Sequence, residues 1–162
     1  MKRSQRILIL LAVVLAGGLV TFGIGWSTEA AKFKTFNLMV TEALAEVPTI
    51  SPAEADQAMR ANLNTLVIDV RDAADIAATG IIPGAVNISL GSLTYKADNE
   101  VPQEWRDPNL GNRSRPIITT CETGEMAALA AKLVKDMGFT NVHILKGGTV
   151  AWKDAGYPTN AQ

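Results

Sequence analysis

The only cysteine of the chain, Cys121, lies in the stretch TTCETGEMA. The apolar residues PIIT lead into this stretch, and an Ala- and Leu-rich segment follows it, which predicts a strand, a short loop and a helix. Cysteine reacts as the thiolate, and backbone N–H groups at the start of a helix stabilise an anion. The pattern therefore predicts a nucleophile in an anion-binding loop. The alternative is a small buried core residue, as free cysteines often are.

The loop is unusual because it carries two glutamates, Glu122 and Glu125, and no arginine. Negative charges close to a thiol oppose its ionisation. Glu125 also falls in the first turn of the predicted helix, where a carboxylate stabilises the helix. Gly124 allows the backbone to turn sharply without a clash at Cβ. Cys121 can thus be activated by backbone N–H groups without a histidine base.

Composition excludes several other classes of site. With one cysteine and one histidine, His143, the chain has neither a disulfide framework nor the ligands of a common zinc site, and we expect no metal and no cofactor. From Pro48 onward there are ten Lys or Arg and thirteen Asp or Glu, a net charge of −3. A nucleic-acid partner is therefore not expected, because phosphate neutralisation requires a basic face.

The N-terminal region predicts a membrane anchor or a signal peptide within residues 1–26. Basic residues in MKRSQR precede twenty uncharged residues, Ile7–Trp26, enough for a helix of roughly 30 Å, the thickness of a bilayer core. The run is longer than most signal-peptide cores, which favours an uncleaved anchor over a cleaved signal. In both cases the N-terminal charges are expected to stay in the cytoplasm. The remaining chain would be extracytoplasmic, on the periplasmic side in a bacterium.

Residues 27–47 predict an amphipathic helix that links this segment to a globular domain over residues 48–162. Its apolar residues recur at three- and four-residue steps and form one stripe; they are Phe33, Phe36, Val40, Leu44 and Val47. The stripe either packs on the following domain or serves as a docking face for a protein partner or the membrane surface. Both alternatives remain open at this point.

Residues 48–162 predict an α/β domain with a mainly parallel sheet and helices on both faces, because strands and helices alternate. Ser51, Pro52 and Glu54 predict a capped helix start. The other expected elements are the strand Leu66–Val70, a short helix ending at Gly80, a strand within IIPGAVNI, an irregular segment 92–115 with a helical turn near Gln103–Arg106, the strand PIITT, the helix EMAALAAKLVKDMG with Met126, Leu129, Leu133 and Met137 on one side and Gly138 as C-cap, the strand NVHIL, and a final short helix in GGTVAWKDAGYP.

The order of VIDVR, GIIPGAVNI, the Cys121 loop and LKGGTVAWKDAGYP resembles a single-domain rhodanese from about Pro48 to Pro158. The resemblance implies an α/β sulfurtransferase whose loop cysteine accepts a sulfane sulfur, becomes a persulfide, and passes the sulfur to a nucleophilic acceptor such as a thiol. It implies Cys121 as the catalytic residue. The implied substrate-binding residues are Glu122, Thr123, Gly124, Glu125, Met126 and Arg71.

Two positions depart from the pattern of the family. The usual rhodanese loop reads Cys-x-x-Gly-x-Arg, and Met126 stands in place of the arginine that helps to bind anionic donors; Ile81 stands where the family often has histidine. We therefore expect the donor to be a low-molecular-weight persulfide, a polysulfide or a protein persulfide, and not thiosulfate. A phosphatase of the Cys-x5-Arg type is disfavoured, since Ala127 is the sixth residue after Cys121.

Four residues outside the loop have expected positions or contacts. Arg71 is expected to form a salt bridge, with Asp69, Asp72 or a loop carboxylate, and alternatively to shape the rim of the site. Lys146 lies at the carboxyl end of a strand, where ligands bind in α/β sheets, and could compensate for the missing arginine. Trp152 is expected in the core and His143 on the polar side of a strand.

The sequence thus predicts a sulfurtransferase acting through a Cys121 persulfide, with a persulfide donor and a thiol acceptor as partners. The alternative is a weakly active or inactive rhodanese-like module that binds a protein partner, presented by residues 27–47.

Overall fold

Residues 33–160 of the chain are described by a computed structural model. The chain divides into two units, Met1–Phe33 and Lys34–Gln162, and the elements below belong to the second. The predicted anchor or signal, Ile7–Trp26, lies outside the described residues. Across residues 33–160, no helix combines the length and the apolar character needed to cross a membrane.

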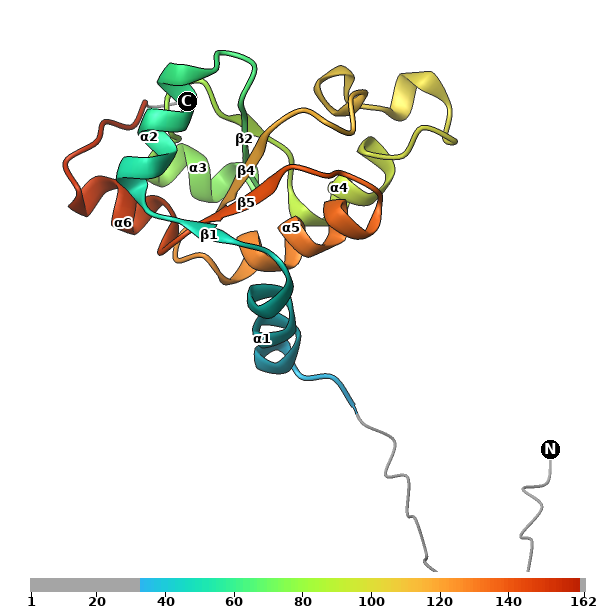
Figure 1. The fold of residues 1–162 in the computed structure, drawn as a ribbon, viewed down its shortest axis with the longest axis horizontal. Helices are drawn as coiled ribbons and strands as arrows, with labels where there is room; N and C mark the ends of the chain where they lie inside the picture. Colours follow the sequence, from blue (N-terminus) through green and yellow to red (C-terminus); the bar gives the residue numbers. More distant parts are fainter. Residues whose placement is uncertain (1–32, 161–162) are drawn as a thin grey trace, which may run out of the picture. The chain divides into compact units, whose positions relative to one another are not determined.

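A sheet of five parallel strands forms the centre of the fold, in the order β1-β5-β4-β2-β3 (Figure 1). The strands are β1 (Thr49–Ile50), β2 (Leu66–Asp69), β3 (Val86–Asn87), β4 (Ile117–Thr120) and β5 (Val142–Leu145). In the register, Ile117 of β4 lies opposite Leu66 of β2 and Val142 of β5. Every residue of β2 and β4 is buried, as in strands covered on both faces. The predicted parallel α/β architecture is confirmed.

Helices follow the strands in alternation. They are α1 (Phe36–Glu46), α2 (Pro52–Ala61), α3 (Ala73–Thr79), α4 (Leu90–Lys96), α5 (Glu125–Asp136) and α6 (Gly148–Asp154), with the 3-10 turns η1 (Gln103–Trp105) and η2 (Pro108–Leu110). The start of α2 is capped as predicted, because the Ser51 hydroxyl accepts the Glu54 N–H and the Glu54 carboxylate accepts the Ser51 N–H at 2.7 Å. Gly80 ends α3, also as predicted.

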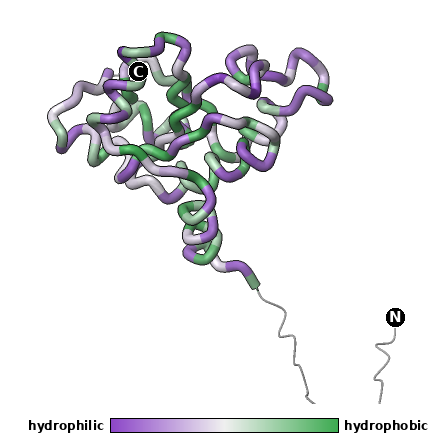
Figure 2. The backbone as a smooth tube through the Cα atoms, in the orientation of Figure 1, coloured by the Kyte–Doolittle hydropathy of each residue, from purple (hydrophilic) through white to green (hydrophobic). Residues whose placement is uncertain are grey.

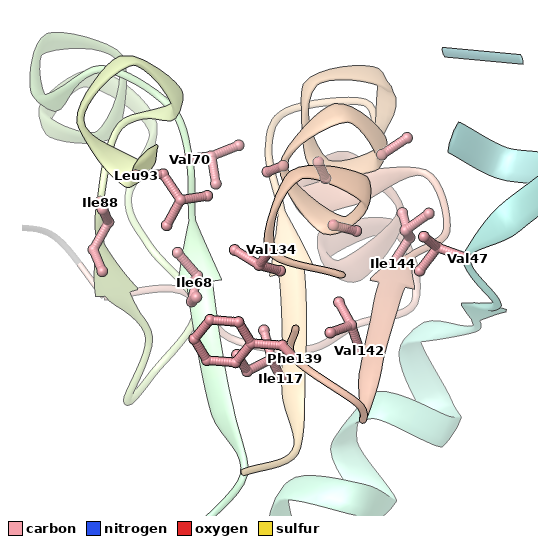
Figure 3. Close-up of a cluster of buried hydrophobic side chains, with 14 of the residues drawn as sticks. Val47, Ile68, Val70, Ile88, Leu93, Ile117, Val134, Phe139, Val142 and Ile144 are labelled. Atoms are coloured by element: carbon pink, nitrogen blue, oxygen red, sulfur yellow. The ribbon is translucent and has the colours of Figure 1, made fainter. Parts of the chain in front are cut away.

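Two hydrophobic clusters cover the two faces of the sheet. The larger one packs side chains of α1, α4 and α5 against the strands, including Ile68, Ile117 and Phe139 (Figure 3). The smaller one packs α2 and α6 against Val67 and Ile118 on the other side. Trp152 belongs to this second cluster, is 2% exposed, and donates its indole N–H to the carbonyl of Pro158 at 2.8 Å. Its expected place in the core is confirmed.

The inner face of α5 is formed mainly by alanines, which the sequence pattern did not indicate. The fully buried residues of this helix are Ala127, Ala128, Ala130, Ala131 and Val134. The predicted stripe lies at the edge of the contact, with Leu129, Leu133 and Met137 partly buried and Met126 exposed. Small side chains allow the helix axis to approach the sheet closely, which a count of large apolar residues does not reveal. The C-cap is Met137 and not Gly138, which follows it at φ +93°.

Helix α1 packs part of its apolar stripe on the domain. Val40, Ala43 and Val47 are buried in the larger cluster, and Lys132 of α5 forms an ion pair with Glu46 at 2.9 Å. Phe36 and Leu44 remain about half exposed. The helix begins after Thr35, whose hydroxyl accepts the Leu38 N–H, so Phe33 precedes it. Packing on the domain therefore accounts for one side of the stripe only.

Two elements differ from the sequence expectations. The segment 92–115 was predicted to be irregular, but its first residues belong to α4; Gly91, Thr94 and Tyr95 are weak helix formers, and burial of Leu93 holds the turn in place. The rest is polar, as the colouring of Figure 2 between α4 and β4 shows, and contains the predicted turn as η1. The short edge strand β1 was not predicted, since two residues carry no periodicity.

Candidate functional site

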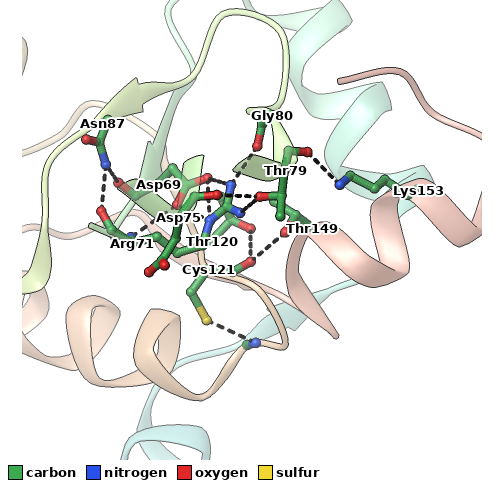
Figure 4. Close-up of polar contacts among 11 residues, drawn as sticks. Asp69, Arg71, Asp75, Thr79, Gly80, Asn87, Thr120, Cys121, Thr149 and Lys153 are labelled. Carbon is green, nitrogen blue, oxygen red and sulfur yellow. Dashed lines mark hydrogen bonds and ion pairs between the residues drawn. The ribbon is translucent and has the colours of Figure 1, made fainter. Parts of the chain in front are cut away.

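Cys121 lies directly after the strand at the middle of the sheet. β4 ends at Thr120 and α5 begins at Glu125, so only four residues connect them. Cys121 is buried, with 3% of the residue exposed, and its Sγ accepts a hydrogen bond from the N–H of Gly124 at 3.1 Å (Figure 4). The sulfur thus meets the amino end of α5, where backbone N–H groups and the helix dipole favour an anion.

The first turn of α6 fixes the backbone of this loop. The Cys121 carbonyl accepts the N–H of Thr149 at 2.8 Å and its hydroxyl at 3.2 Å, and the Glu122 carbonyl accepts the N–H of Val150 at 3.0 Å. Sequence reasoning missed Thr149, which is 2% exposed. The signal that could have indicated it is the pair Gly147 and Gly148 directly after an apolar strand, because glycine permits two backbone segments to approach closely.

Two glycines are required for this arrangement. Gly124 caps α5 at φ +111°, a conformation that residues with a Cβ rarely adopt. At Gly148, with φ +60°, a Cβ would lie 2.5 Å from the carbonyl oxygens of both Cys121 and Glu122. The loop backbone therefore rests directly on the start of α6, and any side chain at residue 148 would displace the loop.

Arg71 forms the ion pair with Asp69 that was one of the alternatives from the sequence. Its Nη2 lies 2.6 Å from Asp69 Oδ2 and 2.8 Å from the Gly80 carbonyl, and its Nη1 donates to the Thr79 hydroxyl at 2.6 Å (Figure 4). Both charged side chains are buried, with 4% and 0% exposed. The hydrogen bonds to Asp69 raise the pKa of Arg71 above its ordinary value, against the opposing effect of burial, and the charge of Asp69 raises it further.

The guanidinium of Arg71 is therefore a fixed positive charge behind the Cys121 loop. Its bonds to Asp69, Thr79 and the Gly80 carbonyl direct it into the protein. A direct role of Arg71 in substrate binding stays a prediction.

The acidic residues of the loop point to solvent. Glu122, Thr123 and Glu125 are exposed. The Thr123 hydroxyl donates to Glu125 Oε2 at 2.5 Å, and this bond lowers the pKa of Glu125, with a smaller contribution from the Glu125 backbone N–H. Glu125 is thus held as a carboxylate at the helix start, while solvent screens its repulsion of a thiolate.

Met126 is 37% exposed in the first turn of α5. It is the residue at which the rhodanese pattern has arginine, and its thioether places no charge near the thiol. The six predicted substrate-binding residues are thus distributed between two adjacent segments. Five directly follow Cys121 in the chain, and Arg71 follows the neighbouring strand β2.

A pocket of about 360 Å³ lies beside the loop, on the side of α1. Thr123, Gly124 and Glu125 form one wall, and Val40 and Leu44 of α1 form another. The residues at the carboxyl end of β5, including Lys146 and Gly147, complete it. Lys146 is exposed, and the pocket places it on the same side of the sheet edge as the loop.

Comparisons with known proteins agree with this geometry. Residues 51–155 match the rhodanese-like domain family. The rhodanese domain-containing protein CG4456 of Drosophila melanogaster is 33% identical over 88 residues, 53% of this chain and 79% of that protein. The thiosulfate sulfurtransferase GlpE of Stutzerimonas stutzeri is 30% identical over 111 residues, 68% of this chain and 89% of that protein.

A solved structure from Rhodopseudomonas palustris, a protein of unknown function described as a possible tyrosine phosphatase, superposes with a TM-score of 0.73 at 30% identity. The match covers 78% of this chain and 95% of that one. In the present chain the position six residues after Cys121 holds Ala127, which is fully buried, and not a phosphate-binding arginine. The rhodanese-like domain family model matches residues 51–155, well over half of the chain, and the chain belongs to this family.

Proposed function

We propose that the protein is a sulfurtransferase that carries a sulfane sulfur as a persulfide on Cys121. The observation that carries the proposal is the contact between Cys121 Sγ and the Gly124 N–H at 3.1 Å, at the amino end of α5. This position stabilises a thiolate without a histidine. The 30% identity to a thiosulfate sulfurtransferase over most of its length supports the same activity class.

The reaction consists of two displacements at sulfur. The Cys121 thiolate attacks the outer sulfur of the donor persulfide; the new S–S bond forms as the donor S–S bond breaks, and the donor leaves as a thiolate with the electron pair. An acceptor thiolate then attacks the outer sulfur on Cys121 and releases the Cys121 thiolate. Electrons balance in both steps, so no external oxidant or reductant is required.

The proposed donor is a low-molecular-weight persulfide, a polysulfide or a protein persulfide. The loop offers an anionic donor no side-chain cation, since Met126 stands at the arginine position and Glu122 and Glu125 add negative charge. A polarisable thioether suits an uncharged sulfur chain better than a small dianion. Thiosulfate is accordingly proposed to be a poor donor.

The experiment is persulfide trapping followed by mass spectrometry of the intact protein. After exposure to a donor persulfide, the protein is expected to gain the mass of one sulfur atom and to lose it on addition of an acceptor thiol. Cys121→Ser is expected to fold, because the change is nearly isosteric, and to gain nothing. Sulfur transfer by Cys121→Ser, or no gain by the unmodified protein, would contradict the proposal; the second result would favour a binding module.

We also propose that the domain is extracytoplasmic and membrane-anchored or exported, on the basis of the sequence of residues 1–26. A reporter that is active only in the cytoplasm, fused after Gln162, is expected to remain silent. A signal from this reporter would show that the domain stays on the cytoplasmic side.

A further inference from the structure

The pocket beside the Cys121 loop is formed in part by residues outside the family match. The match covers residues 51–155, whereas Val40, Leu44 and Thr49 precede it and line the pocket. Val40 and Ala43 are buried against the domain, so α1 is held in place by its own core contacts. The pocket is therefore formed by α1 and the cysteine loop together.

The pocket and the thiol share one neighbouring residue, Gly124. Gly124 lines the pocket, and its N–H is the donor that contacts Cys121 Sγ at 3.1 Å. Cys121 itself is buried, with 3% of the residue exposed, and does not line the pocket. A molecule in the pocket would therefore lie against the loop that carries the reacting sulfur.

The walls of the pocket are suited to an amphiphilic ligand. Val40, Leu44 and Ile144 provide apolar surface. A volume of about 360 Å³ is at the small end of the range for ligand sites, roughly 300–1,000 Å³, and fits a short organic chain. An inorganic sulfur anion would make no use of the apolar wall from α1.

The charged residues around the pocket favour a ligand with a negative charge at one end. Lys146 lines the pocket, is exposed, and has no ion-pair partner among residues 33–160. Glu125, also in the lining, is occupied by the Thr123 hydroxyl and held ionised by it. A ligand carboxylate would be attracted to Lys146 and repelled from Glu125, which fixes its direction in the pocket.

We propose that this pocket binds the organic part of a low-molecular-weight persulfide or thiol substrate, with an aliphatic body against Leu44 and a carboxylate at Lys146. The inference rests on the proposed sulfurtransferase function and names its substrate class. It assigns α1 a role in specificity. It also explains how the protein uses organic substrates without an arginine in the loop.

Binding is measured first, with a probe that cannot transfer sulfur. The S-methyl ether of ω-mercaptohexanoate is titrated into the full chain by calorimetry, next to the S-methyl ether of ω-mercaptohexanol, which has the same chain and no charge. The carboxylate is expected to bind about 2- to 5-fold more tightly, the effect of one exposed ion pair. Equal affinities for the two probes, or no binding of either, would overturn the proposal. Absence of binding is also the result expected if another segment of the chain or a second copy covers the pocket, and the proposal would then be wrong as well.

Variants of Lys146 and Leu44 test whether these two residues account for the binding of the probes. Lys146→Gln is expected to remove the preference for the carboxylate, and Lys146→Arg to retain it. Leu44→Ala is expected to weaken both probes about 3- to 10-fold through lost apolar contact. Leu38→Ala is the matched control, because Leu38 is on the same helix, 39% exposed, and not in the pocket lining; an equal loss in this control would overturn the role of Leu44.

Sulfur transfer is measured second, with the two matching persulfides as donors. The rise in KM for the carboxylate donor in Lys146→Gln is expected to follow the loss of binding, at unchanged kcat. Binding without transfer would refute the sulfurtransferase function and leave the pocket standing. If neither Leu44→Ala nor Lys146→Gln changes the rate of sulfur transfer, the proposed role of the pocket is wrong, whereas the proposed sulfurtransferase function is unaffected.

Discussion

Two loops at the same edge of the sheet are fixed in opposite ways. The loop after β4 is fixed through its backbone, by the bonds of Cys121 and Glu122 to the first turn of α6. The loop after β2 is fixed through side chains, by the buried pair of Asp69 and Arg71. In the first loop the side chains remain exposed and are available for contacts with a substrate. In the second loop the two charged side chains are buried and pair with each other. Because backbone contacts hold the geometry of the reactive loop, its exposed side chains are free to contact a substrate.

The comparison predicts the largest loss of stability at Arg71. Arg71→Met leaves the carboxylate of Asp69 buried without its partner, which is expected to cost about 3–5 kcal/mol of the free energy of unfolding. Urea denaturation followed by circular dichroism measures it. Arg60→Met is the control, because its ion pair with Asp56 is on the surface and Arg60 is 77% exposed; similar losses in the two variants would show that the Asp69 pair has no special structural weight.

A second prediction concerns the backbone support of the reactive loop. Gly148→Ala places a Cβ 2.5 Å from two loop carbonyls at φ +60°, which is expected to cost about 2–4 kcal/mol through strain and overpacking. Persulfide formation on Cys121 is expected to fall as well, because the loop must move. Gly91→Ala in α4 has open space around its Cβ and ordinary φ, and is expected to be tolerated. Unchanged persulfide formation in Gly148→Ala would show that α6 does not position the thiol.

The third prediction tests whether the exposed side chains of the loop choose the donor. Met126→Arg is expected to raise kcat/KM for thiosulfate by roughly 10- to 150-fold, the effect of a charge-assisted hydrogen bond of about 1.5–3 kcal/mol. A neutral persulfide donor is expected to be used equally well or less well. Because Met126 is 37% exposed, the longer side chain fits without repacking. Met126→Leu is the control for bulk, and equal effects of arginine on both donors would mean that residue 126 sets packing only.

The smallest expected effect is at Thr123. Thr123→Val removes the hydrogen bond that lowers the pKa of Glu125, so this pKa is expected to rise toward its ordinary value. A lowered pKa in the folded state stabilises the protein above the unfolded-state pKa, and this contribution is lost as the pH falls through the folded-state pKa. The variant should therefore lose less stability than the parent on acidification. Titration of the Glu125 carboxyl by NMR measures the shift, and an unchanged pKa would contradict the role of the Thr123 hydroxyl.

The features that the sequence predicted depend on residues close together in the chain or on a pattern that repeats along it. The capping box of Ser51 and Glu54 spans one helical turn, and the alternation of strands and helices spans the chain, so both were read correctly. The position of Cys121 between β4 and α5 followed from the same local signals. Asp69 and Arg71 are two residues apart, which made their pairing one of the expected alternatives.

The features that were missed depend on contacts between distant segments. The bond from Thr149 to the Cys121 carbonyl joins the first turn of α6 to the loop after β4, and no local pattern encodes it. The alanine face of α5 depends on how closely that helix approaches the sheet. The pocket depends on where α1 packs, which the stripe of Phe36, Val40 and Leu44 left open between two alternatives.

The contact of Gly148 and Thr149 with the cysteine loop also has a consequence for synthesis. When a ribosome has translated β4 and α5, the polypeptide already contains Cys121, but the two N–H donors of Thr149 and Val150 that fix its loop have not yet been made. The thiol therefore acquires its final surroundings only after α6 has emerged and docked. During translation there is thus an interval in which Cys121 has been made but the two backbone hydrogen bonds that hold its loop are still missing.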